Sequence, residues 1–435
     1  MSRAVGPAMR ACLAAVALLA PVAHAMPKAR SISYYYDGYK QTVRPLTRKL
    51  DLAAGIRAIA GTRQEAANVD ARDQVRLPST WWTPRVGYQP VWAAQMIAAT
   101  GGRATPPTPW TIVKAKSEGV SQGFQILDAN GRRWAIKFDP PDLPELTTAA
   151  DVITSKLYWA AGYNVPSNVI TTFRREDLRL KPGLRYKDPL KGERPVTEAT
   201  LDTLLAHVAR RPDGSWRAVA SLFLKGKPLG EIDYEGRRKD DPEDLIPHER
   251  RRELRGMWAI NAWLDHDDCS SRNTLDLWVT ENGRSFMRHC FLDFSGTLGA
   301  ASITKRSHRS GHEYLLDFEV AFDNLATLGL ARPQWEHAVD PGIPGMGFID
   351  ARTFDPVHWR PFLPNAAFDA RTDRDVRWAV GIVRGFDESV IRAAVQQGQL
   401  SDPRAEDYLV RTLLARRDKL VAAWPAEGGA RTARR

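Results

Sequence analysis

The stretch of sequence that decides the fold is His266-Asp267-Asp268-Cys269-Ser270-Ser271-Arg272-Asn273. A helix is expected directly before it, because apolar residues between 249 and 264 recur with the 3.6-residue period of one helical face. Two apolar strands are expected after it, over 274–279 and 286–292, joined by the turn-forming pair Asn282-Gly283. The second strand runs into Leu292-Asp293-Phe294-Ser295-Gly296. An aspartate at the end of that strand would face Asn273 across the hairpin.

Upstream of this hairpin, the pattern predicts a small antiparallel sheet. Short strands are expected over 111–116, 124–127 and 133–138, and Asn130-Gly131 suits the turn between the second and third. A helix should follow from about Thr148 to Ala161, with Thr148 as its cap and Gly162 ending it. From residue 373 onward the chain should be mainly helical, with Asp402-Pro403 starting the last helix.

Two patterns in the predicted sheet are candidates for ligand binding. In Trp134-Ala135-Ile136-Lys137, Ala135 and Lys137 point to the same side, because successive side chains of a strand alternate. The alternative is an ordinary half-buried strand with a lysine on its wet face. The bend between the first two strands reads Gly119-Val120-Ser121-Gln122-Gly123-Phe124, whose glycines would let backbone N–H groups approach phosphates closely. A plain hairpin bend is the alternative there.

These patterns, in this order, resemble the protein-kinase-like superfamily. The resemblance is nearer to its divergent HipA-type, aminoglycoside-phosphotransferase-type and secreted spore-coat-kinase-like branches than to eukaryotic protein kinases, and it covers roughly residues 110 to 300. It implies an α+β, two-lobed fold with a small antiparallel β N-lobe and a mainly helical C-lobe, preceded by an N-terminal extension. It also implies ATP or another nucleotide, with Mg²⁺, as cofactors.

The resemblance assigns roles to the residues around the hairpin. His266, Asp268 and Asn273 match the H-x-D-x-x-x-x-N spacing of the kinase catalytic loop. Asp268 would take the proton of the acceptor, with His266 and Lys137 as further catalytic residues. Asn273 and Asp293 would hold the metal ion.

A second group of residues would border the nucleotide. Lys137 would reach the phosphates, Ala135 would floor the adenine, and Gly119 and Gly123 would lie along the phosphate loop. Asp151, on the helix after the lysine strand, is the first candidate for the lysine's acidic partner.

The sequence departs from the kinase pattern at three places. The glycine loop is reduced, the glutamate that usually pairs with the lysine is missing, and Ser295 is inserted before the glycine of the D-F-G motif. Glu145 is a second candidate for the acidic partner of Lys137. The sequence therefore predicts a phosphotransferase, with a catalytically inactive kinase fold that binds a nucleotide, glycan or protein as the alternative.

Two other chemistries fit less of the sequence. The residues from Asp293 to Leu298 resemble the nucleophile motif of haloacid-dehalogenase-type phosphatases. That motif needs a second acid where Ser295 stands, and it opens a doubly wound domain. His308 and His312 could present two imidazoles to a metal if they lay on one helix. The intervening Arg309-Ser310-Gly311 favours a polar loop instead.

The N-terminus has the three-part pattern of a secretory signal peptide. Arg3 and Arg10 precede an apolar run over 11–23, which ends in Ala23-His24-Ala25, and cleavage is expected after Ala25. The run is shorter than the roughly 20 residues that cross a membrane. We therefore expect an exported protein, periplasmic or extracellular, with no transmembrane segment after cleavage.

The charge of the chain bears on its partners. Loss of the two signal-peptide arginines lowers the formal net charge from +11 to +9. Acidic and basic residues are mixed along the whole chain, which argues against a nucleic-acid partner. We expect a monomer that acts on an unknown protein, glycan or small-molecule acceptor.

The predicted organisation has five parts. Pro106, Pro107 and Pro109 place a boundary before the first strand, because proline does not fit inside a helix or a central strand. Residues 174–200 and 235–252 are charge-rich and are predicted to be surface insertions. The parts are a signal peptide (1–25), an N-terminal extension (26–109), a kinase-like N-lobe (110–175), a kinase-like C-lobe with insertions (176–425) and a disordered basic tail (426–435).

Two cysteines, Cys269 and Cys290, remain after the predicted cleavage. In a kinase-like hairpin they would be neighbours, so a disulfide is one hypothesis in an oxidising compartment. Two buried thiols are the alternative.

Overall fold

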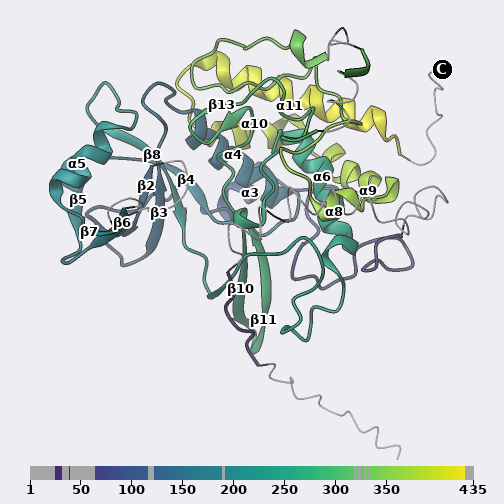
Figure 1. Ribbon diagram of the computed structural model, residues 1–435, viewed down its shortest axis with the longest axis horizontal. Helices are drawn as coiled ribbons and strands as arrows, with labels where there is room; N and C mark the ends of the chain where they lie inside the picture. Colours follow the sequence, from purple (N-terminus) through teal and green to yellow (C-terminus); the bar gives the residue numbers. More distant parts are fainter. Residues whose placement is uncertain are drawn as a thin grey trace, which may run out of the picture.

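A computed structural model describes residues 25–31, 39, 64–115, 122–188, 192–317, 320, 325–327, 330 and 334–426. The chain forms a β-sheet lobe and a mainly helical lobe that lie side by side (Figure 1). The predicted α+β, two-lobed fold class is confirmed. The predicted signal peptide and basic tail lie almost wholly outside the described residues, and Gly119 lies outside them.

The sheet of the N-lobe has the strand order β4-β8-β3-β2-β1-β5, and all neighbouring pairs are antiparallel except β1 and β5. A mainly antiparallel sheet is not the doubly wound domain of the dehalogenase alternative, which is therefore wrong. The strands are β1 (Trp110–Ala115), β2 (Gly123–Leu127), β3 (Arg133–Lys137), β4 (Asn168–Phe173), β5 (Leu178–Leu180) and β8 (Trp216–Leu222).

One face of this sheet is buried because apolar side chains alternate along its strands. In β3, Trp134 and Ile136 point into the core, while Ala135 and Lys137 are half-buried on the other side. Helix α5 (Glu198–Ala206) covers the core face with Leu201 and Leu205.

Helix α4 (Leu146–Ala160) packs against β4 and β8 and begins two residues before the predicted start. Its N-cap residue is Glu145 rather than Thr148, and because the Glu145 side chain makes no cap hydrogen bond, the carboxylate of Asp139 caps the first turn instead. Asp139 Oδ1 accepts hydrogen bonds from the backbone N–H groups of Thr147 (2.8 Å) and Thr148 (2.9 Å), and Thr148 Oγ1 donates to Asp139 Oδ2 (2.6 Å). The capping carboxylate comes from the preceding loop, so the local pattern around Thr148 could not reveal it.

The C-lobe is built around α6 (Arg252–Leu264), in which every residue is buried. Trp258 and Trp263 lie in its hydrophobic core. The last helix begins at Pro403 and Asp402 accepts the Arg404 N–H (2.9 Å), which confirms the predicted start. The other helices of this lobe are α8 (Ala366–Asp369), α9 (Asp373–Arg384), α10 (Glu388–Gln396) and α11 (Pro403–Ala423).

A second sheet has the order β11-β10-β9, and its long hairpin projects from the body of the molecule (Figure 1). Asn282 and Gly283 have φ values of 50° and 75°, which confirms the predicted turn. The remaining strands are β9 (Lys227–Gly230), β10 (Thr274–Glu281), β11 (Arg284–Phe291) and the short pairs β6 (Arg185–Asp188) with β7 (Gly192–Pro195) and β12 (Ala300–Ala301) with β13 (Thr304–Lys305).

The charge-rich segment 235–252 lies only partly at the surface, and the prediction of a surface insertion does not describe its buried residues. Arg238 is buried and pairs with Asp276 (2.8 Å), and His248 is buried against Asp244 (2.8 Å). Arg238 and Asp276 are paired with each other inside the protein, where ion pairing replaces hydration. The other charge-rich segment, 174–200, contributes β5 to the edge of the main sheet.

The described part of the N-terminal extension contacts two core helices, α4 and α6. Trp82 is buried and its Nε1 donates to the carbonyl of Ala161 (2.8 Å), at the end of α4. Asp73 forms an ion pair with Arg252 of α6 (2.7 Å). The extension also contains α3 (Ala93–Ala99), and Lys156 of α4 donates to the carbonyl of Thr100 just beyond it (2.8 Å).

Gly162 fixes the contact between the extension and α4. It has a φ of +112°, and a Cβ there would lie 2.0 Å from Trp82 Nε1. We expect Gly162→Ala to lower the free energy of unfolding by about 3 kcal/mol or more, because backbone strain and a steric clash act together. Gly131→Ala is the matched control, since Gly131 has a φ of +74° and no atom within 4 Å of the added methyl group.

The control should lose about 1 kcal/mol, from the backbone conformation alone. Urea unfolding followed by tryptophan fluorescence measures both variants. Equal losses of unfolding free energy in the two variants would show that the contact of Trp82 with α4 does not require a glycine at position 162.

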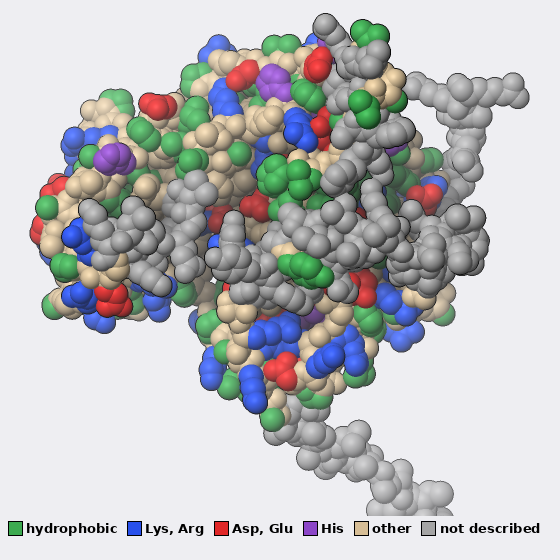
Figure 2. All heavy atoms as spheres, in the orientation of Figure 1, with side chains coloured by type: hydrophobic (Ala, Val, Ile, Leu, Met, Phe, Trp, Pro, Cys, Tyr) green, Lys and Arg blue, Asp and Glu red, His purple; other side chains and the backbone are tan. Residues whose placement is uncertain are grey.

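Acidic and basic side chains are interspersed over the face seen in Figure 2, with several Lys and Arg side chains at the lower end, over the β10–β11 hairpin. Some are paired there, as Arg284 is with Glu243 and Arg288 with Glu281. Within the described ranges, no helix has both the length and the apolar character needed to cross a membrane.

Candidate active site

Three charged residues that are far apart in the sequence meet where the lobes join. Lys137 is the last residue of β3, and its Nζ lies 3.3 Å from Asp151 Oδ2, on α4, and 2.7 Å from Asp293 Oδ1, just beyond β11. Asp151 is fully buried, whereas the side chain of Asp293 is 35% exposed. We call Lys137, Asp151 and Asp293 the charge cluster.

The cluster holds one cation between two carboxylates, and the charges perturb one another. Burial alone would lower the pKa of Lys137, but Asp151 and Asp293 raise it above its usual value. Burial raises the pKa of Asp151, the negative charge of Asp293 adds to this, and Lys137 opposes both. An excess of negative charge in a partly enclosed site favours binding of a further cation.

The structure distinguishes between the two candidate partners of Lys137. Asp151 contacts the ammonium, as the first prediction has it. Glu145 instead precedes α4 and accepts the backbone N–H of Ser401 (2.8 Å), so it is not the partner.

The catalytic-looking loop lies beside this cluster. Asn273 donates from Nδ2 to the backbone carbonyl of Asp268 (3.0 Å), which folds the loop back on itself. Asp268 reaches the surface, yet close protein atoms exclude enough water to raise the pKa of its carboxyl. The Asn273 side chain opposes this shift and the charge of Asp293 adds to it. A carboxylate with a raised pKa is a better proton acceptor than an ordinary one.

The base of the β10–β11 hairpin joins the loop to the charge cluster. Thr274 pairs with Phe291 in the ladder, and Leu292 N donates to Asn273 O (2.8 Å). The prediction that this hairpin sets Asp293 against Asn273 is therefore confirmed at the level of the backbone.

His266 lies beneath the loop. It is buried, and its Nδ1 is 3.1 Å from Tyr158 Oη while its Nε2 is 3.1 Å from the Asp268 carbonyl. Burial lowers the pKa of His266 to about 4, so the ring is neutral at pH 7. With both nitrogens facing protein atoms, the ring is placed to support the loop.

Phe294 connects the elements that carry the site. Its ring is fully buried, with its centroid 4.7 Å from that of Tyr158 on α4 and 5.7 Å from that of His266. The residue before it, Asp293, has a φ of +56°, which turns the chain sharply after β11. Packing of Phe294 thus fixes the position of Asp293 just beyond the end of β11.

The structure bears on two of the residues predicted to border the nucleotide, Ala135 and Gly123. Ala135 lies on the same side of β3 as Lys137, as predicted. Gly123 pairs with Lys137 across the sheet, and a Cβ there would lie 2.3 Å from the carbonyl oxygen of Ile136. Close packing of β2 on β3 is therefore sufficient reason for this glycine.

The donor set is suitable for magnesium. Asp293 and Asn273 offer hard oxygen ligands, and Mg²⁺ in proteins is usually held by one or two carboxylates together with phosphate oxygens and water. Among the described residues, no group of three or more His, Cys, Asp or Glu side chains could hold a metal without such help. Asp293 and Asn273 would therefore suit a Mg²⁺ ion that also has phosphate oxygens as ligands.

Sequence reasoning missed three residues that support the site, because they contact it from distant parts of the chain. Asn168 donates to Asp151 Oδ1 (2.7 Å), Tyr158 contacts His266, and Arg306 forms an ion pair with Asp267. Burial lowers the pKa of Arg306 to about 10. No local pattern singles out any of the three.

The disulfide hypothesis is wrong, because Cys269 and Cys290 are free and buried. Cys269 Sγ donates to the His266 carbonyl (3.0 Å) and accepts from Asn261 Nδ2 (2.7 Å). The thiol therefore belongs to the support of the loop.

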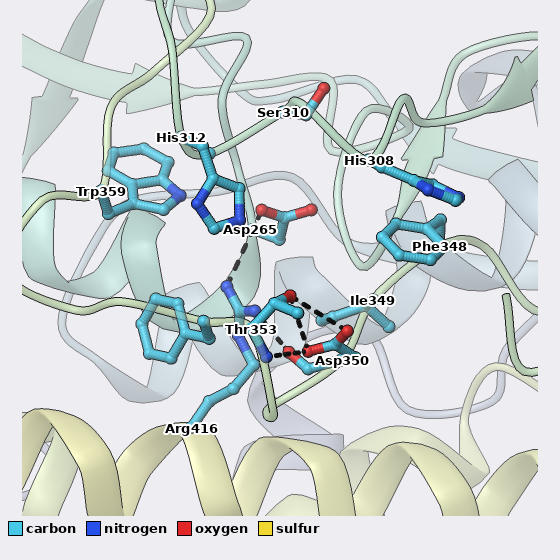
Figure 3. A pocket seen from close by; sticks show the side chains of 12 residues that line it. Asp265, His308, Ser310, His312, Phe348, Ile349, Asp350, Thr353, Trp359 and Arg416 are labelled. Carbon is cyan, nitrogen blue, oxygen red and sulfur yellow. Dashed lines mark hydrogen bonds and ion pairs between the residues drawn. The ribbon is translucent and has the colours of Figure 1, made fainter. Parts of the chain in front are cut away.

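A small cavity lies beside Asp265, the residue that ends α6 (Figure 3). It has a volume of about 20 Å³, which is room for about one water molecule and far too little for a nucleotide. His308 and His312 stand on opposite sides of it, with His308 stacked on Phe348 (3.8 Å), and the polar-loop prediction for them is confirmed.

No protein-family model matches the chain, and no curated protein sequence matches it. Among solved structures, it is similar to the Helicobacter pylori proinflammatory kinase CtkA, with 10% identity, a TM-score of 0.37 and coverage of 72% of this chain and 92% of that chain. It is similar to the Golgi casein kinase, also solved with Mn/ADP bound, with 11% identity, a TM-score of 0.37 and coverage of 77% of each chain. For hydra Fam20 with sugar, the identity is 10%, the TM-score 0.30, and the coverage 69% of this chain and 97% of that chain.

Proposed function

We propose that this chain is an exported, ATP- and Mg²⁺-dependent phosphotransferase of kinase-like fold that acts on an envelope or secreted acceptor. The observation that carries the proposal is the position of Lys137 between Asp151 and Asp293, next to the loop that holds Asp268. An ammonium, a partly exposed carboxylate and a second carboxylate with a raised pKa are the groups that phosphoryl transfer from a nucleotide needs.

Each side chain then has a separate task. Lys137 binds the phosphates while Asp151 keeps its ammonium in place. Asp293 and Asn273 would hold Mg²⁺, which would neutralise charge on the phosphate oxygens. Asp268 orients the hydroxyl group of the acceptor and accepts its proton. The acceptor oxygen forms its bond to the γ-phosphorus as the bond from that phosphorus to the leaving nucleoside diphosphate breaks.

His266 has a positioning role in this scheme. Its neutral ring holds the Asp268 carbonyl, so it orients the loop without touching the acceptor.

One observation favours the alternative, an inactive kinase fold that binds a nucleotide, glycan or protein. Ser295, the residue inserted into the D-F-G pattern, donates to Asp293 Oδ1 (2.6 Å). Lys137 contacts the same oxygen. A carboxylate oxygen that already accepts from two protein donors is a weaker metal ligand, which would limit metal-dependent transfer.

Titration of the purified mature protein with ATP, with and without Mg²⁺, tests the proposal. At 100 times its dissociation constant, a bound nucleotide should raise the free energy of unfolding by about 2.7 kcal/mol in a thermal-shift assay. We expect stabilisation that is much larger with Mg²⁺ than without it, together with phosphoryl transfer to water, to the protein itself or to envelope extracts. Binding without transfer would support the inactive alternative, and no binding of any nucleotide would refute both nucleotide-dependent functions.

A further inference from the structure

We infer that Asn168 is a positioning residue for the charge cluster, and that its amide holds the carboxylate of Asp151 in the orientation that Lys137 requires. The hydrogen bond stands on geometry alone. Its consequence for nucleotide binding rests on the proposed function.

The two oxygens of Asp151 have different partners. Asn168, the first residue of β4, donates from Nδ2 to Asp151 Oδ1 (2.7 Å), and the backbone N–H of Phe294 points at the same oxygen from 3.4 Å. Asp151 Oδ2 is left facing Lys137 Nζ (3.3 Å). One buried carboxylate thus connects β3, β4 and the loop that carries Asp293, and the amide decides which oxygen faces the lysine.

The amide of Asn168 has one acceptable orientation. The residue is 1% exposed, and within the described part of the chain its Oδ1 has no hydrogen-bond partner. Turning the amide over would set this oxygen against the carboxylate of Asp151 and leave Nδ2 without its acceptor. A buried polar atom without a partner is unfavourable. The hydrogen bond from Nδ2 to Asp151 therefore stabilises this orientation by more than the unpaired Oδ1 destabilises it.

The backbone of Asn168 is also fixed, so the amide cannot drift away from Asp151. Lys156, on the same helix as Asp151, donates from Nζ to the Asn168 carbonyl (2.7 Å). On its other side, Asn168 pairs with Ser221 in the β4–β8 ladder. A neutral donor also suits the position, because a cation there would compete with Lys137 for the charge of Asp151.

Asn168→Asp tests the inference, since it keeps the shape and replaces the N–H donor with a carboxylate. Two carboxylates at this distance ionise together only at high pH, so the pair should hold a shared proton with a raised pKa. At low pH the protonated oxygen donates to its neighbour as the amide did. At high pH the two repel and Asp151 turns away from Lys137.

We expect the affinity of Asn168→Asp for ATP with Mg²⁺ to be about 10- to 100-fold below wild type at pH 8, which is the usual loss when a residue that orients a binding group is changed. The affinity should recover as the pH falls. Asn168→Leu should be weak at every pH, because no proton restores its donor. Asn164→Asp is the control, since Asn164 donates to the backbone carbonyls of Thr80 and His289 and does not contact the cluster. Its affinity should not depend on pH in this way.

The ligand-free protein gives a second, independent measurement. The folded state of Asn168→Asp binds a proton that the unfolded state releases, so its stability relative to wild type should fall as the pH rises. If wild type fails to bind ATP, the proposed function fails and this measurement still tests the hydrogen bond. Stability and affinity that follow wild type at every pH would overturn the inference.

A double exchange keeps the test decisive if Asn168→Asp folds poorly. In Asp151→Asn with Asn168→Asp, donor and acceptor trade places and the hydrogen bond survives. Stability should lose the added pH dependence, whereas ATP affinity should remain weak because Lys137 no longer faces a carboxylate on α4. Full recovery of ATP affinity in the double variant would contradict the positioning role.

Discussion

Asp293→Asn should weaken binding of ATP with Mg²⁺ by about 100-fold, because it removes the anionic oxygen that we assign to the metal. Asparagine keeps the size of the side chain, so the effect should come from charge rather than packing. Lys137 also loses its 2.7 Å partner, although Asp151 remains beside it. Isothermal titration with and without Mg²⁺ measures the change, and binding of ATP without metal should change much less.

The control is Asp340→Asn. Asp340 also forms a close ion pair with a lysine, Lys305 (2.7 Å), but that pair is away from the charge cluster. Loss of an ordinary lysine–aspartate contact should leave nucleotide affinity unchanged. Wild-type affinity for ATP with Mg²⁺ in Asp293→Asn would remove Asp293 from the metal site.

Asp268→Asn should impair phosphoryl transfer rather than nucleotide binding. Phosphoryl transfer should fall by about 10²- to 10⁴-fold, the usual contribution of a general base, while nucleotide affinity stays close to wild type. The loop should keep its shape, because Asn273 donates to the backbone carbonyl of residue 268 and not only to the side chain. Single-turnover transfer with saturating ATP and Mg²⁺ measures the loss.

The pH profile separates a base from a structural residue. The pKa of Asp268 is raised, and a base acts in its ionised form, so wild-type transfer should increase as the pH rises through that pKa. Asp268→Asn should lack this rise. An equal loss of nucleotide affinity and transfer in the variant would mean that Asp268 belongs to the binding site instead.

The parts of the fold that could be predicted are those decided by neighbours in sequence. The turn at Asn282-Gly283 follows from residues that accept positive φ, and the start of α11 follows from Asp402 and Pro403. Alternation along β3 correctly set Ala135 and Lys137 on one side. The spacing of Asn273 and Asp293 around a hairpin predicted their approach, because a hairpin brings its ends together.

The parts that could not be predicted depend on contacts between distant segments. Nothing near Asp139 identifies it as the cap of α4, and nothing near Asn168 points to Asp151. The charge-rich segment around Arg238 and His248 was expected at the surface because its composition is polar. Whether such charges are solvated or paired depends on partners such as Asp276, which only the folded chain supplies.

The N-terminal extension has a consequence for how the two lobes move. Two-lobed proteins often exchange ligands by opening about a hinge, and such motion needs a few residues that can change their backbone angles freely. Here Trp82 is bonded to the end of α4, while Asp73 is bonded to Arg252 of α6. The extension thus ties together α4 and α6, whose buried side chains already belong to one hydrophobic core. We expect ligands to enter through local movement of the loops that border the charge cluster, with the angle between the lobes nearly constant.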